Sequence, residues 1–200
     1  CVQIGLRFSH EDSPSRADLQ ISPILMTSEH RPASVKIESN EFHFGISSAL
    51  QNSVSAGWLK LSSTDPHIQP DLDYNYLSDP NDLRRMRQAI HTALRIVEQP
   101  PFSNYIVERL NPTDEDLASD DALDHWLLRN ACTQHHSSGT CKMGPKSDPM
   151  AVVDQYCHVH GLENIRVVDA SVMPDVIRAN TNATAIMIAE RVSDWIKEGR

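Results

Sequence analysis

Apolar and polar residues alternate along the first part of the chain with the two-residue period of a strand that buries one face. Successive side chains of a strand point to opposite sides of its sheet, so such segments hide their apolar faces only by pairing with one another. The alternating apolar positions are Val2, Ile4, Leu6, Phe8, Leu19, Ile21, Val35, Ile37, Phe42 and Phe44. We therefore expect an antiparallel sheet. A further hairpin is predicted from residues 53–61 and 72–77, on either side of the break at Asp65-Pro66.

The pattern changes to a helical period after Asp79-Pro80. Aspartate is a favoured N-cap, and proline is favoured at the first helical position. The apolar residues that then share one helical face are Leu83, Met86, Ile90, Leu94 and Val97. We predict a helix that ends before Pro100-Pro101.

Three more elements are predicted further along the chain. Thr113 with Asp116 three residues on resembles a capping box and predicts a second helix, with a possible restart at Ser119. Apolar residues at 165–168 predict a strand, and the sequence from about Thr184 to Lys197 predicts the last helix.

Composition narrows the classes of function. The chain has 200 residues, 40% of them hydrophobic, which is enough for a buried core. Its formal net charge of −9 argues against a nucleic-acid partner, and no stretch is apolar enough to cross a bilayer. The four cysteines form no Cys-x-x-Cys pair, so we expect reduced, mostly buried thiols. The cellular location stays open, with the cytoplasm favoured, because a targeting region would precede Cys1.

Three segments carry a recognisable pattern. They are His-His-Ser-Ser-Gly-Thr-Cys-Lys-Met-Gly at 135–144, Ile-Arg-Val-Val-Asp-Ala-Ser-Val-Met-Pro at 165–174, and Asn-Thr-Asn-Ala-Thr-Ala-Ile-Met-Ile-Ala-Glu at 180–190. In order, spacing and residue type they resemble the carboxy-terminal motifs of the glucose-methanol-choline (GMC) oxidoreductases. A weaker resemblance includes residues 55–61 and 76–80.

The resemblance implies two catalytic residues and one reaction. His136 takes the place of the family's catalytic base, and Asn182 takes the second catalytic position. The reaction implied is oxidation of a primary or secondary alcohol to a carbonyl, with hydride transfer to flavin N5 of FAD. An imidazole can accept the hydroxyl proton near neutral pH, and an amide can hydrogen-bond the oxygen as charge develops on it. His135 is implied to occupy a packing position.

The cofactor-side residues implied by the resemblance lie at a turn and at a helix start. They are Asp169, Ala170, Asn182, Ala183 and Thr184. The free N–H groups at a helix start favour negative charge, as on reduced flavin. Taken from the residues alone, Asp169 could equally be a plain turn residue, and Asn180 and Asn182 could be helix caps.

The resemblance also implies a fold and a division of the chain. We expect an α+β fold, with residues 1–149 forming a substrate-binding domain of GMC type and residues 150–200 supplying the carboxy-terminal strand and helix of an FAD-binding domain. The Gly-x-Gly-x-x-Gly turn that holds the FAD pyrophosphate is not in the sequence, so we expect the chain to be a fragment. Reduced flavin would pass electrons to oxygen, a quinone or a protein.

Several alternatives stay open. His158 and His160 could belong to a zinc site, although no supporting carboxylate can be identified and we predict no metal. A non-redox lyase on the same scaffold and a non-catalytic remnant are the competing functions. The residue sequence of the 139–144 loop looks most like that of choline dehydrogenases and their aliphatic or aryl alcohol relatives. A quaternary ammonium substrate would need an aromatic cage, for which Trp58, Tyr74 and Tyr76 are candidates.

Overall fold

The computed structural model describes residues 4–11, 13, 15–26 and 43–200. The chain forms two compact units, Cys1–Cys132 and Thr133–Arg200. The boundary predicted at residue 150 is of a different kind, because it separates a substrate-binding domain from a segment that completes an FAD-binding domain. That division stays a prediction.

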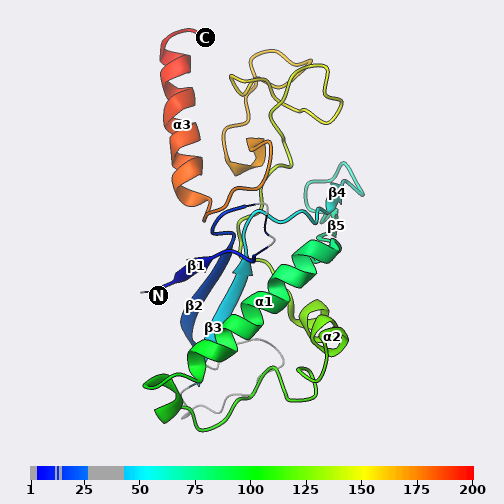
Figure 1. Cartoon of the computed structure of the whole chain (residues 1–200). Coiled ribbons are helices and arrows are strands. Elements are labelled where there is room, and N and C mark those ends of the chain that lie inside the picture. The colour runs from blue at the N-terminus through cyan, green and yellow to red at the C-terminus, as the bar shows by residue number, and fades with distance from the viewer. Residues whose placement is uncertain (1–3, 12, 14, 27–42) are drawn as a thin grey trace. The chain divides into compact units, whose positions relative to one another are not determined.

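A three-stranded antiparallel sheet forms the centre of the first unit (Figure 1). It consists of β1 (Leu6–Phe8), β2 (Leu19–Met26) and β3 (His43–Leu50), with β2 in the middle. Ile21 pairs with Leu6 on one side and with Ser48 on the other. Leu19 and Ile21 are buried, as the alternation predicts. The predicted strand positions Val2, Val35, Ile37 and Phe42 lie outside the described residues.

Helix α1 (Pro80–Val97) packs on β2 and β3, and helix α2 (Asp120–Asn130) packs on α1. Both helices begin at side-chain caps, because Asp79 accepts a hydrogen bond from the Asn81 N–H and Ser119 accepts one from the Ala122 N–H. The core between the two helices is formed by Ile90, Leu123 and Leu127. The helix predicted over 80–97 is confirmed.

The helix predicted to begin at Thr113 is wrong, although its capping pair forms. The backbone N–H of Thr113 donates to the Asp116 carboxylate, and the Asp116 N–H donates to the Thr113 hydroxyl. These bonds close a single turn, in which the Leu117 N–H also donates to the Thr113 carbonyl at 3.2 Å. The continuous helix begins at Ser119, so the predicted restart at that residue is confirmed. A short 3-10 helix, η1 (Phe102–Asn104), lies between α1 and this turn.

The predicted hairpin is confirmed by β4 (Trp58–Lys60) and β5 (Asp71–Asp73), which pair antiparallel. Leu59 is opposite Leu72 in this register, and both side chains are exposed.

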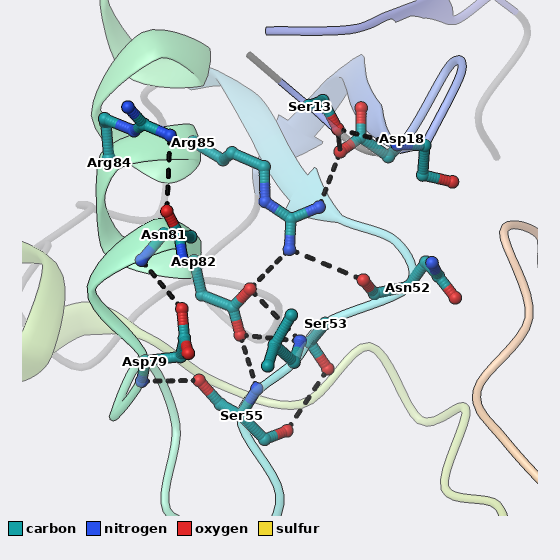
Figure 2. A network of polar contacts seen from close by, with 12 residues as sticks. Ser13, Asp18, Asn52, Ser53, Ser55, Asp79, Asn81, Asp82, Arg84 and Arg85 are labelled. Carbon is teal, nitrogen blue, oxygen red and sulfur yellow. Dashed lines mark hydrogen bonds and ion pairs between the residues drawn. The ribbon is translucent and has the colours of Figure 1, made fainter.

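A buried cluster of charged side chains joins the sheet to α1 (Figure 2). The Arg85 guanidinium lies between the carboxylates of Asp18, which precedes β2, and Asp82, in the first turn of α1. Asp82 also accepts hydrogen bonds from the backbone N–H groups of Val54 and Ser55, at 3.1 and 2.6 Å. Arg85 is thus the shared partner of two buried carboxylates.

The second unit contains η2 (Ala170–Val172) and α3 (Asn182–Lys197), with turns and isolated β-bridges in the segment before η2. Its core is formed by Val153, Cys157, Val172 and Val192. The strand predicted at 165–168 is wrong, because within this segment only Arg166 forms a β-bridge, to His158. Val167 and Val168 pack against the core from an irregular segment. The last helix begins at Asn182, two residues before its predicted start.

Three cysteines lie in the described part of the chain, and all are free. Cys157 is buried and Cys141 is half-buried, but Cys132 is exposed, so the expectation of mostly buried thiols holds only in part. Burial, followed by the charge of Asp154, raises the pKa of the Cys157 thiol. Among the described residues, no helix combines the length and the apolar character that crossing a membrane requires.

Candidate active site

The loop that carries His136 is attached by backbone hydrogen bonds to the segment around η2. The N–H groups of Cys141 and Met143 donate to the carbonyls of Ser171 and Val172, each at 2.9 Å. The Gly139 N–H donates to the Ala170 carbonyl at 3.4 Å. Gly139 has a φ of +80°, a conformation that favours glycine. The first two sequence motifs are therefore neighbours in space.

His136 contacts the residues immediately before α3 through both ring nitrogens. Its Nδ1 lies 3.1 Å from the Thr181 hydroxyl oxygen. Its Nε2 lies 2.7 Å from the side-chain amide nitrogen of Asn180. The ring itself is half-buried. The fold thus brings together residues that are 44 and 45 positions apart in the sequence.

These two contacts indicate which nitrogen of the His136 ring carries the proton. An amide nitrogen can only donate, so the Asn180 Nδ2 donates to an unprotonated Nε2. In a neutral imidazole the other nitrogen then carries the proton, so Nδ1–H donates to the Thr181 hydroxyl. His136 therefore has a lone pair at Nε2, which is the form that a base requires.

The structure places Asn182 differently from Asn180. Asn182 is the first residue of α3, and its side chain is exposed. Within the described part of the chain, no hydrogen bond joins it to His136. Sequence reasoning considered Asn180 only as a helix cap and did not consider Thr181. The signal that could have identified Asn180 is the repeated asparagine of Asn-Thr-Asn, which offers two amides at the same helix start.

His135 lies in a left-handed backbone conformation with φ of +61° and is exposed. Its N–H donates to the Thr133 hydroxyl at 2.9 Å. The loop therefore turns at His135 and directs only the second histidine to α3.

Asp169 and Ala170 form a turn. The Asp169 carboxylate accepts a hydrogen bond from the Ser171 N–H at 2.8 Å and caps η2. Ala170 offers its carbonyl to Gly139, as described above. A role toward a cofactor stays a prediction for both residues.

The start of α3 is open on its amino-terminal side. Thr181 occupies the N-cap position, but its side chain makes no capping hydrogen bond. Asn182 and Ala183 are exposed, and Thr184 is half-buried in the first turn. N–H groups without a capping side chain, at the positive end of a 16-residue helix, suit an anionic or electron-rich partner.

His158 and His160 are each bound to a protein group. His158 Nδ1 lies 3.3 Å from the Asp154 carboxylate, and His160 Nε2 lies 3.1 Å from the Gly144 carbonyl. In the described ranges, no group of three or more His, Cys, Asp or Glu side chains is arranged to hold a metal ion. The hydrogen bonds to Asp154 and Gly144 give both histidines a structural role.

The loop of the first motif and the start of the helix in the third motif are thus in hydrogen-bond contact. The sequence profile of GMC oxidoreductases matches residues 53–189. The chain belongs to the GMC oxidoreductase family, as the three motifs predict.

Curated relatives agree with this assignment. The chain is 41% identical over 163 residues to an oxygen-dependent choline dehydrogenase of Proteus mirabilis (strain HI4320), covering 82% of this chain and 28% of that protein. It is 45% identical over 145 residues to the enzyme of the same name from Klebsiella pneumoniae (strain 342), covering 72% of this chain and 26% of that protein. The chain thus spans little more than a quarter of the length of these relatives.

Solved structures share the fold. A formate oxidase from Aspergillus oryzae RIB40 superposes with a TM-score of 0.82 at 24% identity, covering 94% of this chain and 32% of that chain. A fungal aryl-alcohol oxidase superposes with a TM-score of 0.68 at 27% identity, covering 92% and 29%. The predicted α+β fold, the carboxy-terminal part of a GMC oxidoreductase, is confirmed apart from the missing strand at 165–168.

Proposed function

We propose that the protein containing this chain oxidises a primary or secondary alcohol to a carbonyl with FAD as cofactor and His136 as base. One observation carries the proposal. Nε2 of His136 lies 2.7 Å from the side-chain amide nitrogen of Asn180, two residues before α3. An acceptor for the hydroxyl proton and a donor for the oxygen that loses it are thus side by side, in motifs of an oxidoreductase family.

The start of α3 fits a flavin. Its first turn has no capping side chain, and its positive end would stabilise negative charge on a reduced ring. Asn182, Ala183 and Thr184 are the residues that would lie against the cofactor, with Asp169 and Ala170 at the adjoining turn. FAD, when bound, supplies the hydride acceptor.

The chain's own residues would handle the proton and the oxygen. The alcohol O–H bond breaks and its proton passes to Nε2 of His136, while the C–H bond breaks as hydride leaves and the C=O bond forms. Asn180 would exchange its hydrogen bond to Nε2 for one to the substrate oxygen. A positioned base of this kind contributes roughly 10²–10⁴-fold in rate.

Two asparagines compete for the donor role. The family resemblance gave it to Asn182, while the contact with Nε2 favours Asn180. We propose Asn180 as the donor, with Asn182 facing the cofactor from the first turn of α3. Comparing the two alanine variants separates the roles, since loss of one donor to a charged oxygen typically costs about 10²–10³-fold.

Choline or a related amino alcohol is the proposed substrate, because the relatives described above are named choline dehydrogenases. Among the aromatic candidates for a cage, Tyr74 and Tyr76 stack on each other, with ring centroids 5.1 Å apart. The Trp58 ring is already faced by the Lys60 ammonium, at 4.6 Å. We therefore propose no cage from these residues. Oxygen is the first electron acceptor to test.

The experiment is anaerobic stopped-flow reduction of the FAD-loaded protein by choline, which measures chemistry without the acceptor. We expect His136→Ala to retain flavin and to be reduced roughly 10²–10⁴-fold more slowly. His135→Ala is the matched control, because its exposed ring precedes the turn, and we expect a much smaller loss. If both variants were reduced at the native rate, the alcohol oxidoreductase assignment would be abandoned.

A further inference from the structure

Thr181 sits at a helix N-cap but does not act as one. Threonine at this position ordinarily accepts a hydrogen bond from an N–H of the first turn and has an extended backbone. Here the backbone is helical, with φ of −78° and ψ of −14°, and the hydroxyl makes no capping bond. The side chain is 9% exposed, and its oxygen lies 3.1 Å from His136 Nδ1. The hydroxyl is therefore directed to the histidine.

The direction of this hydrogen bond follows from the neighbouring one. Nε2 of His136 accepts from the Asn180 amide, so the ring proton of the neutral imidazole is on Nδ1. Thr181 must then accept at its oxygen, although a hydroxyl can also donate. The hydroxyl accepts from the tautomer that the Asn180 amide sets, and it restrains the rotation of the ring.

We infer that Thr181 is a positioning residue, whose hydroxyl restrains the rotation of the His136 ring so that Nε2 faces the alcohol. The inference rests on the proposed role of His136 as base. After proton transfer both ring nitrogens carry hydrogen, and the Thr181 oxygen still accepts from Nδ1. The same contact therefore serves the neutral and the protonated ring, and the ring does not need to rotate during the reaction.

The acceptor at Nδ1 is the side chain of Thr181 and not its backbone carbonyl. The carbonyl of Thr181 accepts from the Ala185 N–H within α3. The side-chain oxygen of Thr181 remains as the acceptor at Nδ1, at the point where α3 meets the histidine loop.

The test compares three variants in the FAD-loaded protein. Thr181→Val keeps the shape and removes the oxygen, Thr181→Ser keeps the oxygen, and Thr181→Ala is a second hydroxyl-free variant in case valine does not fold. Flavin content and melting temperature report folding. Reduction by choline in anaerobic stopped flow gives the rate. Nitrogen-15 NMR of labelled histidine, assigned by difference from His136→Gln, gives the tautomer.

We expect Thr181→Val and Thr181→Ala to bind FAD normally, to be reduced about 10–100-fold more slowly, and to shift the native nitrogen-15 signal of His136 Nδ1, with Thr181→Ser close to native. A native rate and Nδ1 signal in Thr181→Val would overturn the inference, while a slow His136→Ala would leave the proposed function standing. Equal losses in the valine and serine variants with an unchanged Nδ1 signal would indicate a packing role and would also overturn it. A native rate in His136→Ala would remove the proposed function itself.

Discussion

Replacing Arg85 by methionine is the sharpest test of what holds the first unit together. Asp18 and Asp82 are fully buried and Arg85 is 2% exposed, so three charged groups share a site that is shielded from bulk solvent. Arg85 Nη1 donates to Asp18 at 2.5 Å, and its Nη2 donates to Asp82 (Figure 2). Methionine fills a similar volume but leaves two carboxylates buried without their shared cation.

The magnitude follows from that geometry. Removing one partner of a buried ion pair costs about 3–5 kcal/mol, because the other charge stays uncompensated. Asp82 keeps its bonds from the N–H groups of Val54 and Ser55, which favours the lower part of that range. Since 1.4 kcal/mol is tenfold, a loss of about 3 kcal/mol corresponds to roughly 10²-fold more frequent opening.

Hydrogen exchange followed by mass spectrometry is the suitable assay, because it measures local opening of β2, β3 and α1 within a larger protein. Arg95→Met in the same helix is the control. Arg95 is exposed, and among the described residues its side chain bonds the nearby Thr92 hydroxyl alone, so exchange should change within about 0.5 kcal/mol. Adding Asp18→Asn to Arg85→Met should recover part of the protection. If Arg85→Met exchanged like Arg95→Met, the cluster would not stabilise this unit.

Two other predictions follow from single residues. Burial acts to raise the pKa of Asp82, but hydrogen bonds from Ser55, Val54 and Arg85 outweigh it and hold the pKa below its ordinary value. The stabilisation by Asp82 is therefore complete above the unfolded-state pKa near 3.9 and is lost as the pH falls through the lower folded-state pKa. An acid titration followed by circular dichroism should therefore be less steep for Asp82→Asn. Gly139→Ala and Gly161→Ala both place alanine at φ of +80° and should each cost about 1–2 kcal/mol in thermal unfolding, but only Gly139→Ala should slow flavin reduction. Equal rates in the two glycine variants would contradict the role of the 139–143 loop in holding His136.

Local signals explain which parts of the fold could be predicted from the sequence. The helix at 80–97 was predictable because its cap, its proline and its apolar face all lie within the helix itself. The segment 165–168 was misread because its half-buried valines pack against the core of Val153 and Val192 from an irregular segment, which no local period reveals. Thr113 and Asp116 form the hydrogen bonds of a capping box, but the helix that follows begins later, at its own N-cap, Ser119.

The residues of the candidate site were also predictable only in part, because α3 begins two residues before its predicted start. His136 is identified by a contiguous motif, but its partners depend on where the helix 44 residues later begins. With a start near Thr184, Asn182 would lie in the connecting segment that meets the loop. Because α3 begins at Asn182, that residue is already in the first turn, and the connecting segment ends at Asn180 and Thr181. These two side chains are the ones that reach Nε2 and Nδ1 of His136. The helix boundary therefore decides which asparagine contacts His136, and a sequence pattern that leaves helix starts uncertain by two residues leaves that contact uncertain by the same two.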